Sequence, residues 1–175
     1  MLNEQTMNRL ELLATEVAEK EGCLLYDLEF TNSGGTRTLR IYIDKKSEPV
    51  GLEDCSNVSK GLNLTLDTDE DIIPGGAYSL EVSTPGLERS LKKPWHFEAA
   101  IGKKISLRLK KSLESFGVTD GGLKSAKQLT QEISRVSDVG PVFLIKEVDI
   151  EIPFEMIEKA KIVFEFNSSK PNKKR

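Results

Sequence analysis

Residues 24–44 of the 175-residue chain read LLYDLEFTNSGGTRTLRIYID, and this stretch decides the fold of the first half. Apolar and polar residues alternate on both sides of the glycine pair at 34–35, and a period of two is typical of half-buried strands. Residues 32–35, Asn-Ser-Gly-Gly, supply a turn between the two runs. The stretch therefore predicts a β-hairpin. Its inward positions are Leu24, Tyr26, Leu28 and Phe30 in the first run, and Leu39, Ile41 and Ile43 in the second.

Two amphipathic helices and a third strand flank this hairpin. Apolar residues three and four positions apart predict a helix over 3–21, which ends at Gly22, and a second helix over 52–66. A strand is expected at 78–82. We predict an α+β domain of order αββαβ, in which two helices cover one face of a three-stranded sheet. The apolar positions behind this prediction are Leu10, Leu13, Ala14, Val17, Leu52, Cys55, Val58, Leu62, Leu66, Tyr78, Leu80 and Val82.

The two halves of the chain carry opposite net charge. Residues 1–84 hold 7 lysines and arginines against 16 aspartates and glutamates, whereas residues 85–175 hold 18 against 12. Such asymmetry indicates two units with different surfaces. We expect an acidic α/β domain at 1–90, a second domain at 91–167 and a basic flexible tail at 168–175. A partner that contains both RNA and protein suits these charges.

The second half is predicted to be rich in short strands. Pro94 favours the start of a short helix over 95–101, because a proline fits the first helical position. Residues 126–137 have helical spacing, and the pattern alone leaves helix and strand open. Several short strands with one helical turn suggest a small β-barrel. The apolar anchors of the helix are Trp95, Phe97 and Ile101, the strands are expected over 103–111, 142–146, 148–152 and 162–166, and the turn over 153–160.

The segment around the first of these strands is the most basic part of the chain. Residues 85–111 hold 8 lysines and arginines against 2 glutamates. The strand is expected to bury 105, 107 and 109 and to expose 104, 106, 108 and 110, which offers a contact for a polyanion. The alternative is a charged face that maintains solubility or protects an edge from pairing. Because no aromatic residue interleaves, an RNA contact would be to the backbone. The candidate contact residues are Arg89, Lys92, Lys93, Lys103, Lys104, Arg108 and Lys110.

The two halves are joined by a loop whose residues are Ser83, Thr84, Pro85, Gly86, Leu87, Glu88 and Arg89. Its proline and glycine preset a tight turn. One interpretation is a corner held by hydroxyl hydrogen bonds and by pairing of Glu88 with Arg89. The other is an exposed loop that offers Arg89 to phosphate or carboxylate. Composition alone favours the corner.

Catalytic and metal sites are not indicated by the sequence. His96 is the one histidine, and Cys23 and Cys55 have no obvious base beside them. The acidic run at 67–71 lacks the glycine and glutamate that a calcium loop needs at its sixth and twelfth positions. We therefore expect no enzymatic activity, no cofactor and no metal. Without a bilayer-spanning apolar run or a secretory signal, we expect a cytoplasmic protein with no membrane contact.

Several segments resemble, in order, the bacterial RimP family of ribosome maturation factors. The most characteristic is 78–91, YSLEVSTPGLERSL, where a tyrosine-led strand runs into a Pro-Gly-Leu loop that ends on an acid and an arginine. The resemblance covers the chain from about residue 24 to residue 166. The other matching segments are 40–44, 52–59, 67–71, 96–97, 101–103 and 157–163.

This resemblance implies more than the patterns do. It implies that 126–137 is a strand and that the second domain is an Sm-like or SH3-like barrel. It implies a non-catalytic factor, expected as a monomer, that binds the maturing small ribosomal subunit through a ribosomal protein, its rRNA or both, and assists its biogenesis. The alternative is a free-standing Sm-like RNA-binding regulator, which would form homo-oligomers. The acidic first domain disfavours this alternative because it repels RNA.

Overall fold

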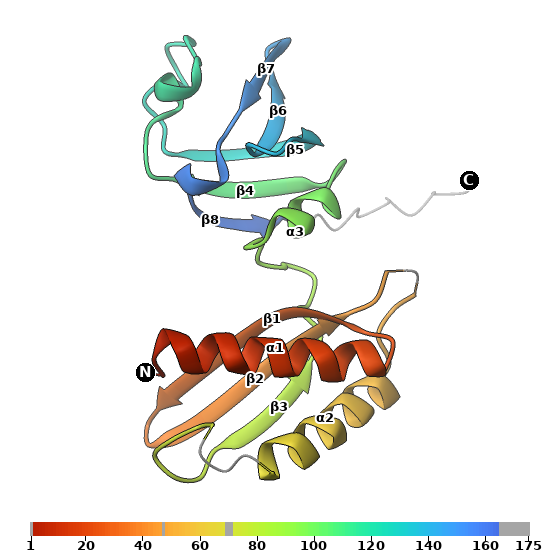
Figure 1. The fold of residues 1–175 in the computed structure, drawn as a ribbon. Coiled ribbons are helices and arrows are strands. Elements are labelled where there is room, and N and C mark those ends of the chain that lie inside the picture. The colour runs from red at the N-terminus through yellow and green to blue at the C-terminus, as the bar shows by residue number, and fades with distance from the viewer. Residues whose placement is uncertain (1, 47, 69–71, 165–175) are drawn as a thin grey trace, which may run out of the picture. The chain divides into compact units, whose positions relative to one another are not determined.

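The computed structural model describes residues 2–46, 48–68 and 72–164, and the chain divides between Pro85 and Gly86 into two compact units (Figure 1). Each unit has its own hydrophobic core. Within the described ranges, no helix combines the length and the apolar character needed to cross a membrane. The predicted tail at 168–175 and the acidic residues 69–71 lie outside the described residues.

The first unit has the predicted order αββαβ. Its sheet runs β1-β2-β3, with β2 antiparallel to β1 and parallel to β3. Both helices lie over the same face of this sheet (Figure 1). The elements are α1 (Glu4–Lys20), β1 (Leu24–Ser33), β2 (Thr36–Asp44), α2 (Leu52–Asp67) and β3 (Ser79–Ser83).

The core of the first unit lies between this sheet and the two helices. The central strand β2 buries Leu39, Ile41 and Ile43, as its alternation predicts. Burial of such a side chain contributes about 1.5–3 kcal/mol. The helices approach closely where Gly61 of α2 faces Val17 of α1. The helix residues that complete the core are Leu10, Ala14, Val17, Ala18, Val58, Leu62 and Leu66.

Two details of the first unit differ from the sequence prediction. The pairing of β1 with β2 shifts between Leu25 and Asp27, so that Leu25 joins the core instead of the predicted Leu24. Such a bulge inserts one residue and changes which side chains face inward, and alternation alone does not reveal it. Leu52, predicted on the buried stripe of α2, is 91% exposed, because it is the first residue of the helix.

The second unit is built on a five-stranded antiparallel sheet of order β7-β6-β5-β4-β8. Residues 128–136 form a strand, as the family resemblance implies, and not the helix that the spacing of their apolar residues allows. No pairing between β7 and β8 is seen among the described residues, so a closed barrel is not shown. The elements are α3 (Pro94–Glu98), β4 (Lys104–Leu109), η1 (Leu113–Phe116), β5 (Gln128–Val136), β6 (Pro141–Ile145), β7 (Val148–Glu151), η2 (Phe154–Met156) and β8 (Ile157–Ile162).

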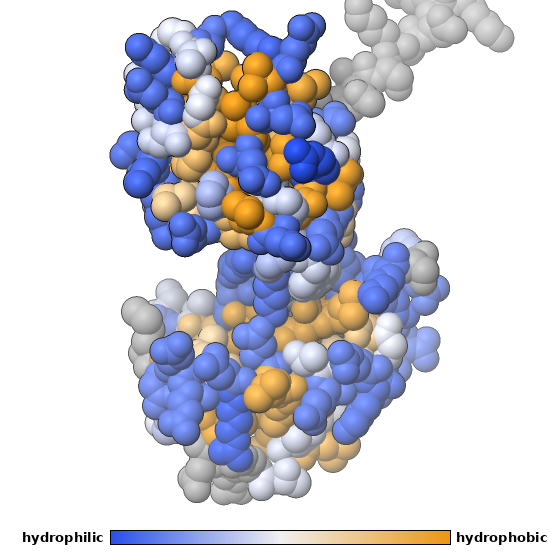
Figure 2. All heavy atoms as spheres, turned by 45° about the horizontal axis from the view of Figure 1, so that its top comes forward, coloured by the Kyte–Doolittle hydropathy of each residue, from blue (hydrophilic) through white to orange (hydrophobic). Residues whose placement is uncertain are grey.

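Two predictions for the second unit are wrong. Ile101 is 48% exposed and does not anchor the helix, whereas Phe97 is fully buried. The last strand begins at Ile157, not at residue 162, because the 3-10 turn before it takes only three residues. In Figure 2, hydrophobic residues are visible between hydrophilic ones on this unit. Its exposed large apolar side chains include Val139, Leu144 and Val148.

Candidate functional site

Strand β4 places its basic side chains on the outer face of the second sheet. Ile105, Leu107 and Leu109 are at most 1% exposed and form part of the core. Because side chains alternate along a strand, Lys104, Ser106 and Arg108 face the other way. The side chains of Lys104 and Arg108 are exposed, as the sequence predicts.

Strand β8 adds two lysines to this face that the sequence analysis missed. Lys159 lies opposite Arg108, and Lys161 lies opposite Ser106, in the antiparallel register of β4 with β8. The signal is the alternation of Lys159, Ala160 and Lys161, but the helical turn predicted over 153–160 includes the first two of these residues. We call Lys104, Arg108, Lys159 and Lys161 the outer basic face.

Carboxylates of the same unit already neutralise part of this face. Arg108 Nε lies 3.8 Å from Glu158 Oε2, and Lys161 Nζ lies 2.6 Å from Glu88 Oε2. On β5, Glu132 lies opposite Lys104. Exposed pairs of this kind contribute little to stability and exchange readily for another partner.

Three cations in or beside the outer basic face remain available. Lys103, Lys110 and Lys159 are exposed and have no ion-pair partner in the described part of the chain. Lys103 and Lys110 lie directly before and after β4. Their charges therefore remain available to a phosphate or a carboxylate of a partner.

The junction loop is bound to the second unit by its last residues. The N–H of Ile162 donates to the carbonyl of Arg89, and the N–H of Leu91 to the carbonyl of Ala160, both at 2.9 Å. Residues 89–91 therefore lie along the outer edge of β8, with Ser90 bridged to Lys161.

The polar side chains of this loop make contacts within the loop and with β8. Arg89 Nε donates to the Gly86 carbonyl at 3.1 Å, and Gly86 has a φ of +73°, which favours glycine. Ser83 Oγ donates to the Thr84 carbonyl at 3.4 Å. The structure pairs Glu88 with Lys161, a partner that the sequence analysis did not propose. Leu87 is exposed.

His96 is a structural residue at the start of α3. It is 2% exposed, and its Nδ1 accepts the backbone N–H groups of Lys92 and Lys93 at 3.0 and 3.3 Å. Its ring packs edge-on against Trp95 with centroids 4.2 Å apart. The histidine thus holds the backbone of two candidate contact residues. Of these, Lys92 has an exposed side chain and Lys93 a half-buried one.

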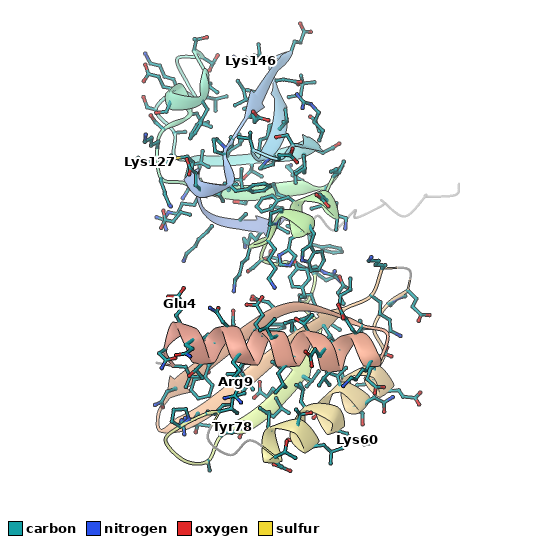
Figure 3. All side chains as sticks on the ribbon, in the orientation of Figure 1. Glu4, Arg9, Lys60, Tyr78, Lys127 and Lys146 are labelled. Atoms are coloured by element: carbon teal, nitrogen blue, oxygen red, sulfur yellow. The ribbon has the colours of Figure 1, made fainter. Side chains whose placement is uncertain are left out.

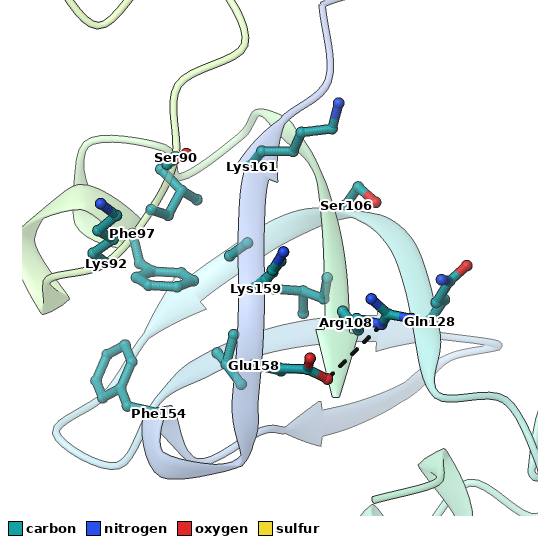
Figure 4. A pocket seen from close by; sticks show the side chains of 14 residues that line it. Ser90, Lys92, Phe97, Ser106, Arg108, Gln128, Phe154, Glu158, Lys159 and Lys161 are labelled. Carbon is teal, nitrogen blue, oxygen red and sulfur yellow. Dashed lines mark ion pairs between the residues drawn. The ribbon is translucent and has the colours of Figure 1, made fainter. Parts of the chain in front are cut away.

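A hollow of about 660 Å³ lies around β8 within the second unit. Figure 4 shows Phe97 and Phe154 on one side of the strand, and Arg108 and Gln128 on the other. The two phenylalanine rings meet edge-on with centroids 5.3 Å apart. A volume of this order is typical of ligand pockets, about 300–1,000 Å³.

The first unit presents an acidic face on the side of its sheet away from the helices. There Glu29 and Glu81 lie on either side of Arg40 in the strand register, and Asp27 lies opposite Tyr42. Arg40 Nε donates to Glu81 at 2.7 Å, and this hydrogen bond raises the pKa of Arg40. In Figure 3, charged side chains such as Glu4 and Lys60 project from the helices of this unit.

The two thiols are poor nucleophiles. Burial, followed by the charge of Asp54, raises the pKa of both Cys23 and Cys55 above the ordinary value. A raised pKa leaves little thiolate at neutral pH. Within residues 2–46, 48–68 and 72–164, no three His, Cys, Asp or Glu side chains are grouped so as to hold a metal ion.

Comparison with known protein families finds a match in the N-terminal part of the chain. Residues 13–88 match the RimP N-terminal domain. The match begins within α1, includes all three strands of the first sheet and ends inside the junction loop.

Proposed function

Because the chain belongs to the RimP family of ribosome maturation factors through its N-terminal domain, we propose that it binds the maturing small ribosomal subunit and assists its biogenesis. The observation that carries this proposal is the family match over residues 13–88. In this proposal the protein is a non-catalytic assembly factor that acts as a monomer in the cytoplasm, where ribosomes are assembled. We also propose that its second domain is an Sm-like or SH3-like barrel.

The charges of the two units support a partner made of RNA and protein. The acidic face around Arg40 complements a lysine- and arginine-rich ribosomal protein, and complementary charge speeds encounter. The cations near β4 suit the backbone of rRNA. We propose that the contact residues are Arg89, Lys92, Lys93, Lys103, Lys104, Arg108 and Lys110, together with Lys159.

The covered edge of β8 disfavours the alternative of an RNA-binding homo-oligomer. Strand edges with unpaired backbone groups are the surfaces through which sheets of different chains join. Here residues 89–91 pair with β8 from Ala160 to Ile162. A second copy would have to displace them before its own strand could pair at this position.

Charge reversal tests the contact surface. We compare a contact variant, in which Lys103, Lys104, Arg108 and Lys110 become glutamate, with a control in which Lys20, Lys46, Lys60 and Lys124 become glutamate. All eight side chains are exposed, and both variants have the same net charge. If all four wild-type side chains contact phosphates, the plot of log affinity against log salt should be less steep for the contact variant, with a slope smaller in magnitude by about 3.

Binding to purified free small subunits is measured by sedimentation at several salt concentrations, after circular dichroism has shown that both variants are folded. We expect the control to bind like the wild type apart from the general effect of charge. Equal binding by the two variants would remove the β4 cations from the mechanism.

Substitution of Arg89 separates contact from structure in the junction loop. We expect Arg89→Ala to weaken binding to small subunits while the melting temperature stays the same, because the hydrogen bond from Arg89 to the Gly86 carbonyl is exposed. A lower melting temperature at unchanged affinity would assign Arg89 to the structure of the loop alone.

A further inference from the structure

One part of the outer edge of β8 remains open. The pairing of residues 89–91 reaches only to Ala160, after which the chain turns into α3. In the pairing of β8 with β4, Glu158 has no partner residue, because the strand bulges there. From Ile157 to Lys159, no strand lies along the outer edge in the described part of the chain. Such an edge can pair with an extended peptide.

The two sides of this open edge differ in chemistry. On the inner side, the apolar residues that line the hollow include the buried Leu91 and Phe97 and the half-buried Phe154. On the outer side, Lys159 points away from the core and has no ion-pair partner among the residues described. Successive side chains of an added strand would face these two sides in turn.

The charge of the outer side sets the chemistry of the partner. A side chain directly across from Lys159 would lie about 4.5–5.5 Å away, Cβ to Cβ. Opposite charges at such positions stabilise the pair, and like charges destabilise it. The charged side chains that line the hollow are Lys92, Arg108, Glu158, Lys159 and Lys161, which gives an excess of cations.

We propose that the open edge of β8 from Ile157 to Lys159 binds an extended polypeptide in which acidic residues alternate with apolar ones. The apolar side chains enter the hollow beside the half-buried Phe154, the acidic ones lie beside Lys159, and the backbone pairs with the strand. This proposal goes beyond the proposed function, because the binding that it describes does not require the small subunit.

A polypeptide fits this site better than single-stranded RNA does. Bases bind to proteins by stacking on exposed aromatic faces. Phe97 is 2% exposed, and Phe154 is half-buried with its ring against Phe97. The open edge of a strand, in contrast, offers the N–H and C=O groups that another backbone requires.

The test uses the full chain and a fluorescein-labelled hexapeptide that alternates glutamate and valine. Binding is measured by fluorescence anisotropy and located by the amide signals of the isotope-labelled protein. Two further peptides carry N-methyl groups, one on all valines and the other on all glutamates. Each methyl group removes one backbone donor, so the two peptides block opposite edges of an added strand. A labelled hexauridylate is the RNA probe.

We expect the hexapeptide to bind, to shift the amide signals of residues 157–160, and to lose binding in at least one N-methylated form. Lys159→Glu should weaken binding about fivefold or more through repulsion of the peptide carboxylates, whereas the exposed control Lys124→Glu should not. Absence of binding, shifts elsewhere, or full binding by both methylated peptides would overturn the proposal. The proposal would also be overturned if hexauridylate, and not the peptide, shifted the amide signals of residues 157–160. Because no subunit is present, a negative result leaves the proposed function intact.

Discussion

The close contact between the two helices of the first unit predicts an unusual response to alanine at Gly61. An ideal Cβ at this position would lie 2.8 Å from Cγ1 of Val17. Alanine favours a helix interior over glycine by about 1 kcal/mol. Overpacking of a core costs about 1–3 kcal/mol. Valine is confined to one rotamer in a helix, so the clash is not relieved by rotation.

Gly61→Ala should therefore lower the free energy of unfolding by as much as about 2 kcal/mol, in spite of the gain in helix propensity. In a Val17→Ala background the obstructing methyl groups are absent. There the same substitution should raise the free energy of unfolding by about 1 kcal/mol. The sign of the effect at Gly61 thus depends on residue 17.

The four proteins of this double-mutant cycle are compared by urea denaturation. Far-UV circular dichroism is the probe, because the two long helices, α1 and α2, both lie in the first unit. A coupling of more than about 0.5 kcal/mol identifies residues in contact. If Gly61→Ala stabilised the protein equally in both backgrounds, the contact between Gly61 and Val17 would be refuted.

Two other substitutions test contacts in the first unit. Arg37 donates to the carbonyls of Gly76 and Pro74 at 2.6 and 2.5 Å and stacks over Phe30, so Arg37→Ala should lower the melting temperature clearly more than Arg40→Ala, which removes an exposed ion pair. Equal melting temperatures would contradict this. The pKa of Asp54 is lowered by its hydrogen bonds from Lys45 and from the Gly51 N–H. A lowered pKa in the folded state stabilises the protein above the ordinary pKa, about 4, and this stabilisation is lost as the pH falls through the lowered value. Asp54→Asn should therefore reduce the melting temperature at neutral pH and flatten its fall in acid, whereas an unchanged acid profile would exclude this role.

The fold of the first unit was largely predictable from its sequence. Strict alternation around Ile41 and helical spacing around Leu62 each fix one buried face, and both patterns agree with the observed order. The bulge near Leu25 was not predictable, because a run of apolar residues accommodates either register. The need for glycine at 61 depends on Val17 of another helix, which local pattern does not contain.

The second unit was less predictable, because short strands carry weak signals. The helical spacing at 126–137 misleads, since Leu129 and Ile133 also lie on one face of a strand. Of the candidate cations, those on β4 followed from its alternation. Lys159 did not, because its position depends on the pairing of β8 with β4, far away in sequence. The partner of Glu88 depends on the same pairing.

Parallel sedimentation of the purified protein with free small subunits, assembled ribosomes and naked RNA tests the proposed function most directly. The account predicts that the protein sediments with free small subunits and not with assembled ribosomes. Binding to naked RNA as strong as, or stronger than, binding to subunits would contradict the account and favour an RNA-binding regulator.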